Sequence, residues 1–232
     1  MPVPNTRPKV GDRVFATLLE AVLSGRYAPG EKLPGQRALA DDLGVTMTAL
    51  REALKRLEQM GLIDVRHGDA MRVTDPSQRG SLDVLAPLLF RSGGVDASVL
   101  ADVLEARTLM LGELAALAAQ RRSGAQAARL RELAAAVAVA PDPQAAQGVD
   151  WVWANELASA ADNLVFVLVL NAIRSVYFEH ADRLPVTADP PELAPLYTAA
   201  AEAITAGDAD GARTTVRALA QLQRERVEAA LR

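Results

Sequence analysis

The chain has 232 residues, of which half are apolar and 23% are charged, and its formal net charge is −4 at pH 7. These proportions are typical of a globular protein, and the length allows one large domain or two domains of about 100–200 residues. There is no cysteine, and His67 and His180 are the two histidines. This excludes disulfide bonds, iron–sulfur clusters, thiol nucleophiles and a histidine-rich zinc site.

No segment of the sequence has the hydropathy of a signal peptide or of a membrane-spanning helix. Residues 1–12 have no apolar core of the kind found in a signal peptide. The longest run of large apolar residues, Leu164–Leu170, is far shorter than the roughly 20 residues that span a bilayer. We therefore expect a cytoplasmic protein with no membrane partner.

The first third of the chain predicts three helices. The first has apolar residues at helical spacing from Val14 to Val22 and stops at Gly25. A second, short helix closes at Gly44, and Thr46 is the expected N-cap of the third.

A β-hairpin is predicted after these helices. The third helix has its apolar face at Leu50, Ala53, Leu54 and Leu57, and it ends before Gly61. Apolar and polar residues then alternate on both sides of His67-Gly68-Asp69, which is typical of two strands joined by a turn.

The turn-rich segment that follows marks a domain boundary. The expected division is a first domain at 1–75, a linker at 76–80 and a second domain at 81–232. Helical patterns in the second part cover roughly these ranges: 80–91, 96–122, 125–138, 149–162, 164–183, 192–206 and 209–231. No strand is predicted there, Ala140–Gly148 is expected to be a loop, and Asp208 is expected to cap the last helix.

Two short helices joined by a glycine-containing turn are the pattern of a helix-turn-helix, whose second helix enters the major groove of DNA. With the hairpin as a wing, the first domain is predicted to be a winged helix-turn-helix. The residues expected to face DNA are Arg37, Thr46, Met47, Thr48, Arg51, His67 and Gly68. The alternative is a small helical domain with an ordinary charged surface.

These residues resemble the N-terminal signature of the GntR superfamily of transcription regulators. The matching segments are Gln36-Arg37-Ala38-Leu39-Ala40, Leu43-Gly44-Val45-Thr46, Leu50-Arg51-Glu52-Ala53-Leu54 and Gly61-Leu62-Ile63. The resemblance implies a winged helix that binds a palindromic operator as a homodimer. Met47 stands where the family usually has arginine, the commonest reader of guanine, so roughly 1–3 kcal/mol of discrimination at one base pair is expected to be missing.

In the second domain, Arg107 lies beside an apolar stripe that includes Val103, Met110 and Leu114. A guanidinium with little water around it needs an anion. That anion is either a carboxylate or phosphate of a ligand, or an acidic side chain of the same domain.

The segment Leu164–Leu170 is apolar around the whole helix and is expected to run through the centre of the domain, with Asn171 following as a buried amide. Aromatic residues add apolar surface to this region, although core packing is an alternative explanation for each. The candidate ligand-binding residues are Arg107, Phe166, Asn171, Tyr177 and Tyr197.

This half resembles the C-terminal domain of the FadR-type branch of the superfamily, through Leu104-Glu105-Ala106-Arg107, Ala160-Ala161-Asp162-Asn163 and Ala203-Ile204-Thr205-Ala206-Gly207-Asp208. The predicted fold class is therefore mainly α, with the winged helix-turn-helix followed by an all-α helical bundle that binds a ligand. Many members of the branch hold a metal with one aspartate and three histidines.

At those four positions this chain has Asp150, Ala154, Tyr197 and Leu219, so no metal is expected. Asp150 is expected instead to be the N-cap of a helix that begins at Trp151. The resemblance then implies a metal-free member whose effector is a fatty acyl-CoA.

The sequence thus predicts a ligand-responsive DNA-binding transcription regulator, homodimeric, with no cofactor, that a long-chain fatty acyl-CoA releases from its operator. The alternatives are a metal-free sensor of another small organic acid and a DNA-binding protein with a purely structural dimerisation domain. Residues 1–75 hold 11 basic and 10 acidic side chains, which argues against non-specific DNA binding. An enzyme is not expected, because there is no Ser-His-Asp order, glycine-rich phosphate loop or metal set.

Overall fold

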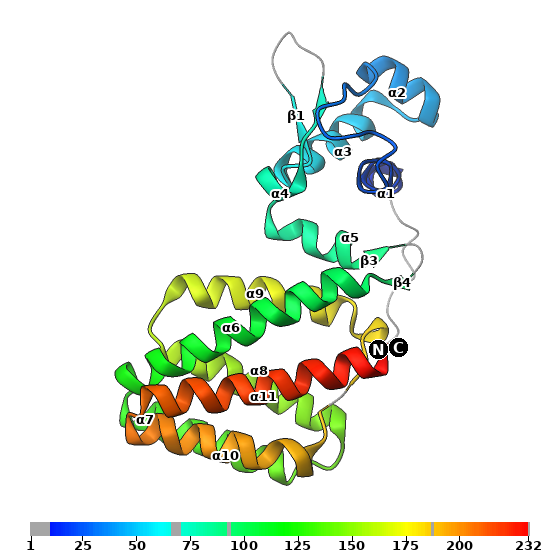
Figure 1. The fold of residues 1–232 in the computed structure, drawn as a ribbon. Coiled ribbons are helices and arrows are strands. Elements are labelled where there is room, and N and C mark those ends of the chain that lie inside the picture. Colours follow the sequence, from blue (N-terminus) through cyan, green and yellow to red (C-terminus); the bar gives the residue numbers. More distant parts are fainter. Residues whose placement is uncertain (1–9, 66–70, 92–93, 187, 232) are drawn as a thin grey trace. The chain divides into compact units, whose positions relative to one another are not determined.

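The computed structural model describes residues 10–65, 71–91, 94–186 and 188–231 (Figure 1). The chain divides into two compact units, Met1–Leu88 and Leu89–Arg232. The N-terminal unit is longer than the predicted first domain because the chain after residue 75 still packs on it. The expected linker forms helix α4 (Pro76–Arg79), and Val84 lies in the N-terminal core.

The N-terminal unit contains the predicted three helices and hairpin. Its elements are α1 (Val10–Leu23), α2 (Gln36–Leu43), α3 (Met47–Gln59), β1 (Ile63–Asp64) and β2 (Arg72–Val73), followed by α4, the 3-10 turn η1 (Leu82–Val84) and α5 (Leu85–Leu89). The strands pair antiparallel, with Ile63 opposite Val73. α1 packs across α3, and Leu50 and Leu57 of α3 are fully buried between them and the hairpin.

The C-terminal unit is a bundle of helices, as predicted (Figure 1). Its helices are α6 (Ala97–Arg121), α7 (Gly124–Ala138), α8 (Pro143–Ala160), α9 (Leu164–Glu179), α10 (Pro190–Ala206) and α11 (Ala209–Ala230), with the 3-10 turn η2 (Ala181–Arg183) after α9. α6 runs along α11, and α10 packs against α7 and α11. The predicted cap is confirmed, since the Asp208 side chain accepts the Gly211 backbone N–H at 2.9 Å. No described helix is long and apolar enough to cross a membrane.

Three local predictions for this part are wrong: the helix over 80–91, the absence of strands and the loop at 140–148. The predicted helix over 80–91 ends at Leu89, and β3 (Phe90–Arg91) pairs with β4 (Gly94–Val95), where Gly94 has a φ of +122° that a residue with a side chain rarely adopts. The expected loop at 140–148 contains the first turn of α8. Pro143 occupies the start of that helix, where no N–H is needed, and Asp142 caps it.

α9 is a surface helix, so the prediction that it passes through the centre of the domain is wrong. Leu164, Val165 and Leu168 are 72%, 68% and 58% exposed, whereas Leu170 is buried. The centre is instead filled by side chains of other helices, including Leu114 and Leu157. When a helix is apolar on every side, its sequence does not indicate which side packs against the core.

Candidate functional site

The helix-turn-helix is built by two local devices. Gly44 ends α2 in the left-handed conformation with a φ of +63°, and its N–H bonds back to the last turn of the helix. Two residues later Thr46 begins α3, and its hydroxyl accepts the Ala49 backbone N–H at 3.3 Å, which confirms the predicted cap. The turn and the cap therefore fix where α3 begins, and the first turn of α3 lies at the surface.

Most of the residues expected to face DNA are exposed. Arg37, Thr46, Thr48 and Arg51 are open to solvent, and neither arginine has a carboxylate partner among the residues that the structure describes. The Arg51 guanidinium donates to the Gln36 side chain at 3.5 Å, which links α3 to α2. These side chains form a polar surface with unpaired positive charge at the N-terminus of α3, which suits a phosphate backbone.

The three other residues expected to contact DNA are not exposed side chains of the described structure. Met47 is half-buried and packs against the N-terminal core, so much of its side chain is directed away from solvent. His67 and Gly68 lie outside the described residues. At the base of the hairpin, Arg72 donates to the Gly30 carbonyl oxygen at 3.0 Å, and a bridge joins its backbone to Lys32.

A cavity lies in the C-terminal unit, between α6, α8, α9 and α11. It has a volume of about 770 Å³, including the part open to solvent. Its wall consists mainly of apolar side chains, with a few polar ones among them. The lining residues are Leu89, Leu100, Val103, Leu104, Arg107, Gln147, Asp150, Trp151, Ile173, Val176, Tyr177, Leu184, Pro185, Ala188, Gln223 and Val227. An apolar cavity with a few placed polar groups is the usual form of a small-molecule site.

Four polar side chains from four helices close a hydrogen-bonded ring at this cavity, which we call the polar ring: Arg107 (α6), Asp150 (α8), Tyr197 (α10) and Gln223 (α11). Arg107 donates to the Asp150 carboxylate at 3.3 Å and to the Gln223 side-chain oxygen at 2.8 Å. The Tyr197 hydroxyl donates to the other Asp150 oxygen and accepts from the Gln223 amide nitrogen at 3.2 Å.

Burial keeps the Tyr197 hydroxyl of the ring protonated. Tyr197 is fully buried, and this burial, together with the nearby Asp150 charge, raises the pKa of its phenol well above 10. The hydroxyl therefore keeps its proton at neutral pH and donates it to Asp150. The pKa of Tyr177, which also lines the cavity, is raised by the same two causes.

The anion that Arg107 requires is thus the internal alternative, the side chain of Asp150. Asp150 is not the N-cap of a helix at Trp151, because α8 begins two turns earlier and buries Asp150 on its inner face with Ala146 and Ala154. That i, i+4, i+8 spacing is the signal in the sequence that places Asp150 on the buried stripe.

The structure brings only part of the predicted ligand set to the cavity. Arg107 and Tyr177 line it, and Tyr197 belongs to the polar ring without lining the cavity. Phe166 packs on the core, Asn171 is half-buried, and neither is among the lining residues. Gln223 and Trp151 line the cavity, although no pattern in the sequence had indicated them as ligand-binding residues.

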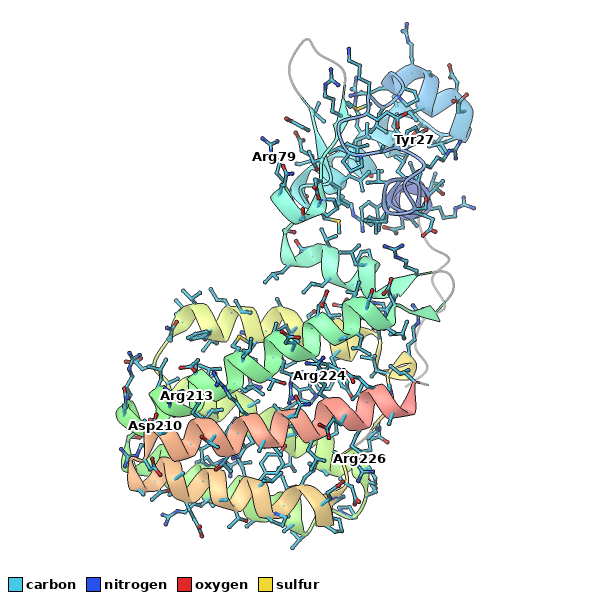
Figure 2. All side chains as sticks on the ribbon, in the orientation of Figure 1. Tyr27, Arg79, Asp210, Arg213, Arg224 and Arg226 are labelled. Carbon is cyan, nitrogen blue, oxygen red and sulfur yellow. The ribbon has the colours of Figure 1, made fainter. Side chains whose placement is uncertain are left out.

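The arginines labelled on α11 are paired with carboxylates in the described part of the chain, unlike Arg51 on the exposed face of α3. Figure 2 labels Arg213, Arg224 and Arg226, and each is paired with carboxylates of the same unit. Arg213, for example, contacts Glu113 at 3.0 Å and also pairs with Asp210. Within the described ranges, no group of three or more histidine, aspartate or glutamate side chains is placed to hold a metal ion.

Comparison with known families and proteins assigns both units. Residues 11–73 match the family model of "Bacterial regulatory proteins, gntR family", and residues 102–222 match that of the "FCD domain". The chain is 37% identical over 220 residues to the HTH-type transcriptional regulator Mce2R of Mycobacterium tuberculosis, covering 94% of this chain and 92% of that protein.

Two further comparisons concern a function and a fold. A fatty acid metabolism regulator protein of Pasteurella multocida is 28% identical over 161 residues, which is 69% of this chain and 65% of that protein. A solved structure titled for Lar, which controls the expression of the Listeria monocytogenes agr system, superposes with a TM-score of 0.57 at 17% identity, covering 98% of this chain and all of that one. This last likeness shows the fold.

Proposed function

Since the chain belongs to the GntR family of bacterial regulatory proteins and carries an FCD domain, we propose that it is a transcription regulator whose affinity for DNA is set by a small molecule in the C-terminal cavity. It binds DNA through the N-terminal helix-turn-helix, and its relatives are regulators rather than enzymes. The observation that carries the proposal is the cavity itself, with its apolar wall and its buried polar ring.

The position of Leu89 suggests how the cavity is coupled to DNA binding. Leu89 is the first residue of the C-terminal unit, directly after the last residue of the N-terminal unit, and it is 2% exposed in the cavity wall. The strand β3 that follows contacts η2, because the Arg183 guanidinium lies 4.8 Å from the Phe90 ring and donates to the Arg91 carbonyl oxygen at 3.2 Å. A ligand that displaces Leu89 therefore moves the residue at which the chain passes from one unit to the other.

We propose that the regulator binds DNA as a homodimer on a palindromic operator, so that each helix-turn-helix occupies one half-site. A second copy would cover the exposed apolar side chains of α9, Leu164, Val165 and Leu168. The mass in solution tests this. Leu168→Glu is expected to give monomers that bind the full operator more weakly, while Glu202→Leu, on the exposed surface of α10, leaves the dimer intact.

The first candidate for the effector is a long-chain fatty acyl-CoA, and the second is another small organic acid. The apolar wall of the cavity suits an acyl chain, and relatives that carry the name fatty acid metabolism regulator support this choice. A purely structural C-terminal domain is disfavoured because protein interiors are normally close-packed, and an open apolar cavity adds nothing to the packing of a structural bundle.

The test measures DNA release directly. Fluorescent DNA from upstream of the gene is bound by the protein and titrated with a long-chain acyl-CoA below its micelle concentration, with zinc plus citrate as the control. Acyl-CoA alone is expected to lower the anisotropy of the DNA. If DNA binding is indifferent to acyl-CoA, the regulator stands and this effector is wrong.

A pair of variants on α6 tests whether the cavity is the site. Val103→Phe adds bulk to the cavity wall and is expected to desensitise the protein to effector while DNA binding is retained. Leu109→Phe makes a similar change on the exposed side of the same helix and is expected to respond like the wild type. Equal sensitivity of both variants would place the effector elsewhere.

A further inference from the structure

The cavity wall carries no net charge. Among its described lining residues, Arg107 and Asp150 are the charged side chains, and they pair with each other at 3.3 Å with 13% and 5% of their side-chain surfaces exposed. The two remaining members of the polar ring complete the hydrogen bonding of this pair. Gln223 accepts a hydrogen bond from Arg107, Tyr197 donates one to the second Asp150 oxygen, and Gln223 also donates to Tyr197. The one cation of the wall is therefore already neutralised by an internal carboxylate.

This arrangement disfavours a ligand that brings a negative charge into the cavity. A carboxylate bound to Arg107 would either displace Asp150, leaving it buried without a cation, or lie next to it as a second anion. The first outcome leaves an uncompensated buried charge, and the second is a like-charge contact in a site with little water. Neither penalty applies to a ligand whose polar group is uncharged.

A second observation indicates what that polar group does. The Trp151 side chain lines the cavity, its residue is 8% exposed, and its indole N–H has no hydrogen-bond partner among the described residues. Its ring packs between aromatic neighbours, with centroid distances of 5.1 Å to Tyr177 and 5.6 Å to Phe178. A buried donor without an acceptor is destabilising, and an indole N–H can only donate. The indole N–H of Trp153 also has no partner among the described residues, but Trp153 does not line the cavity, so Trp151 is the unpaired indole that a ligand there would meet.

We propose that the part of the ligand inside the cavity is uncharged, and that the cavity selects an aliphatic chain with a neutral carbonyl, such as an ester, thioester or amide, over the corresponding free carboxylate. The chain lies on the apolar wall, the carbonyl oxygen accepts the Trp151 indole N–H, and the Arg107–Asp150 pair stays intact. This inference rests on the proposed function, because it assumes that the cavity is the effector site.

Matched ligands test the selectivity. Equilibrium dialysis of the full-length protein at pH 7 is run with decanamide, S-ethyl thiodecanoate and decanoate, which share one alkyl chain. The neutral compounds are expected to bind about tenfold more tightly than the carboxylate, or better. Equal or tighter binding of decanoate overturns the proposal. If decanoate also releases operator DNA, the proposed function survives this failure, whereas absence of binding by acyl compounds from octanoyl to hexadecanoyl overturns both.

Asp150→Asn tests the cause of the selectivity. The substitution keeps the size of the side chain and its ability to accept from Arg107, but it leaves the Arg107 charge uncompensated. Binding of decanoate is expected to improve by about tenfold while binding of decanamide changes little. An unchanged ratio between the two ligands would show that the internal pair does not set the selectivity.

The two tryptophans provide a matched pair for the hydrogen bond. Trp151→Phe keeps an aromatic ring and removes the N–H, and it is expected to weaken decanamide binding several-fold. Trp153→Phe makes the same change at a buried residue of α8 that does not line the cavity, and it is expected to leave the affinity unchanged. Equal effects at both positions would contradict the proposed hydrogen bond. This pair decides the question even if Asp150→Asn does not fold.

Discussion

In the N-terminal unit, the exposed side chains expected to face DNA lie between Arg37 and Arg51 and project into water, whereas the polar ring of the C-terminal unit joins four helices and is buried. Arg51 is exposed and has no described carboxylate partner, while Arg107 is held by Asp150 and Gln223. An unpaired exposed cation can exchange water for a phosphate at little cost, but a buried pair resists a new anion. We therefore propose that the two units recognise opposite chemistry, a polyanion in the N-terminal unit and an uncharged acyl group in the C-terminal cavity.

The sharpest test of this contrast compares two arginines of the C-terminal unit. Arg107→Met leaves Asp150 buried without its cation and is expected to lower the free energy of unfolding by about 3–5 kcal/mol. Arg129→Met removes an exposed pair with Glu132 and is expected to change it by less than about 0.5 kcal/mol. Both tryptophans lie on α8, so denaturant unfolding followed by their fluorescence reports on this unit. Similar losses for both variants would contradict the comparison.

On the DNA side, Arg51→Ala is expected to weaken operator binding by about 1–3 kcal/mol, roughly fivefold to 150-fold. The measurement is anisotropy of labelled operator at one fixed salt concentration, because the affinity depends on salt. Arg129→Ala carries the same change of charge in the C-terminal unit and serves as the control. A loss of equal size in both variants would mean that net charge, rather than a contact, controls the affinity.

Alkaline pH is expected to destabilise the C-terminal unit through Tyr197. The folded state raises the pKa of this phenol, so above about pH 10 the unfolded state binds fewer protons and stability falls, by up to about 1.4 kcal/mol per pH unit. Tyr197→Phe removes this contribution, while Tyr177 remains in both proteins. Unfolding between pH 9 and pH 11 should therefore show a shallower slope for the variant, and parallel slopes would refute the assignment.

The smallest expected effect concerns the cap of α3. Thr46→Ala removes the acceptor of the Ala49 N–H and is expected to cost about 1 kcal/mol of local stability. Hydrogen exchange at the first turn of α3 measures this loss. Thr17→Ala, whose hydroxyl bonds back to the Arg13 carbonyl oxygen within α1, is the matched control and should leave the exchange of α3 unchanged.

Local signals in the sequence were sufficient for the helix-turn-helix. Gly44, Thr46 and the buried face of α3 each act within a few residues, because a left-handed turn, a cap and a helical stripe depend on neighbours in the chain. The same holds for the Asp208 cap in the C-terminal unit. From such signals the fold class and the exposure of Arg37 and Arg51 followed directly.

Only the tertiary structure shows which side chains meet at the cavity. Whether Arg107 meets a ligand or an internal acid depends on which residue of α8 faces it, and these positions are 43 residues apart in the chain. The exposure of α9 was equally undetermined, because its apolar residues lie on every side and only packing against α8 shows which ones stay in water. Burial and pairing between distant helices are properties of the folded bundle, so they become visible only when its helices are assembled.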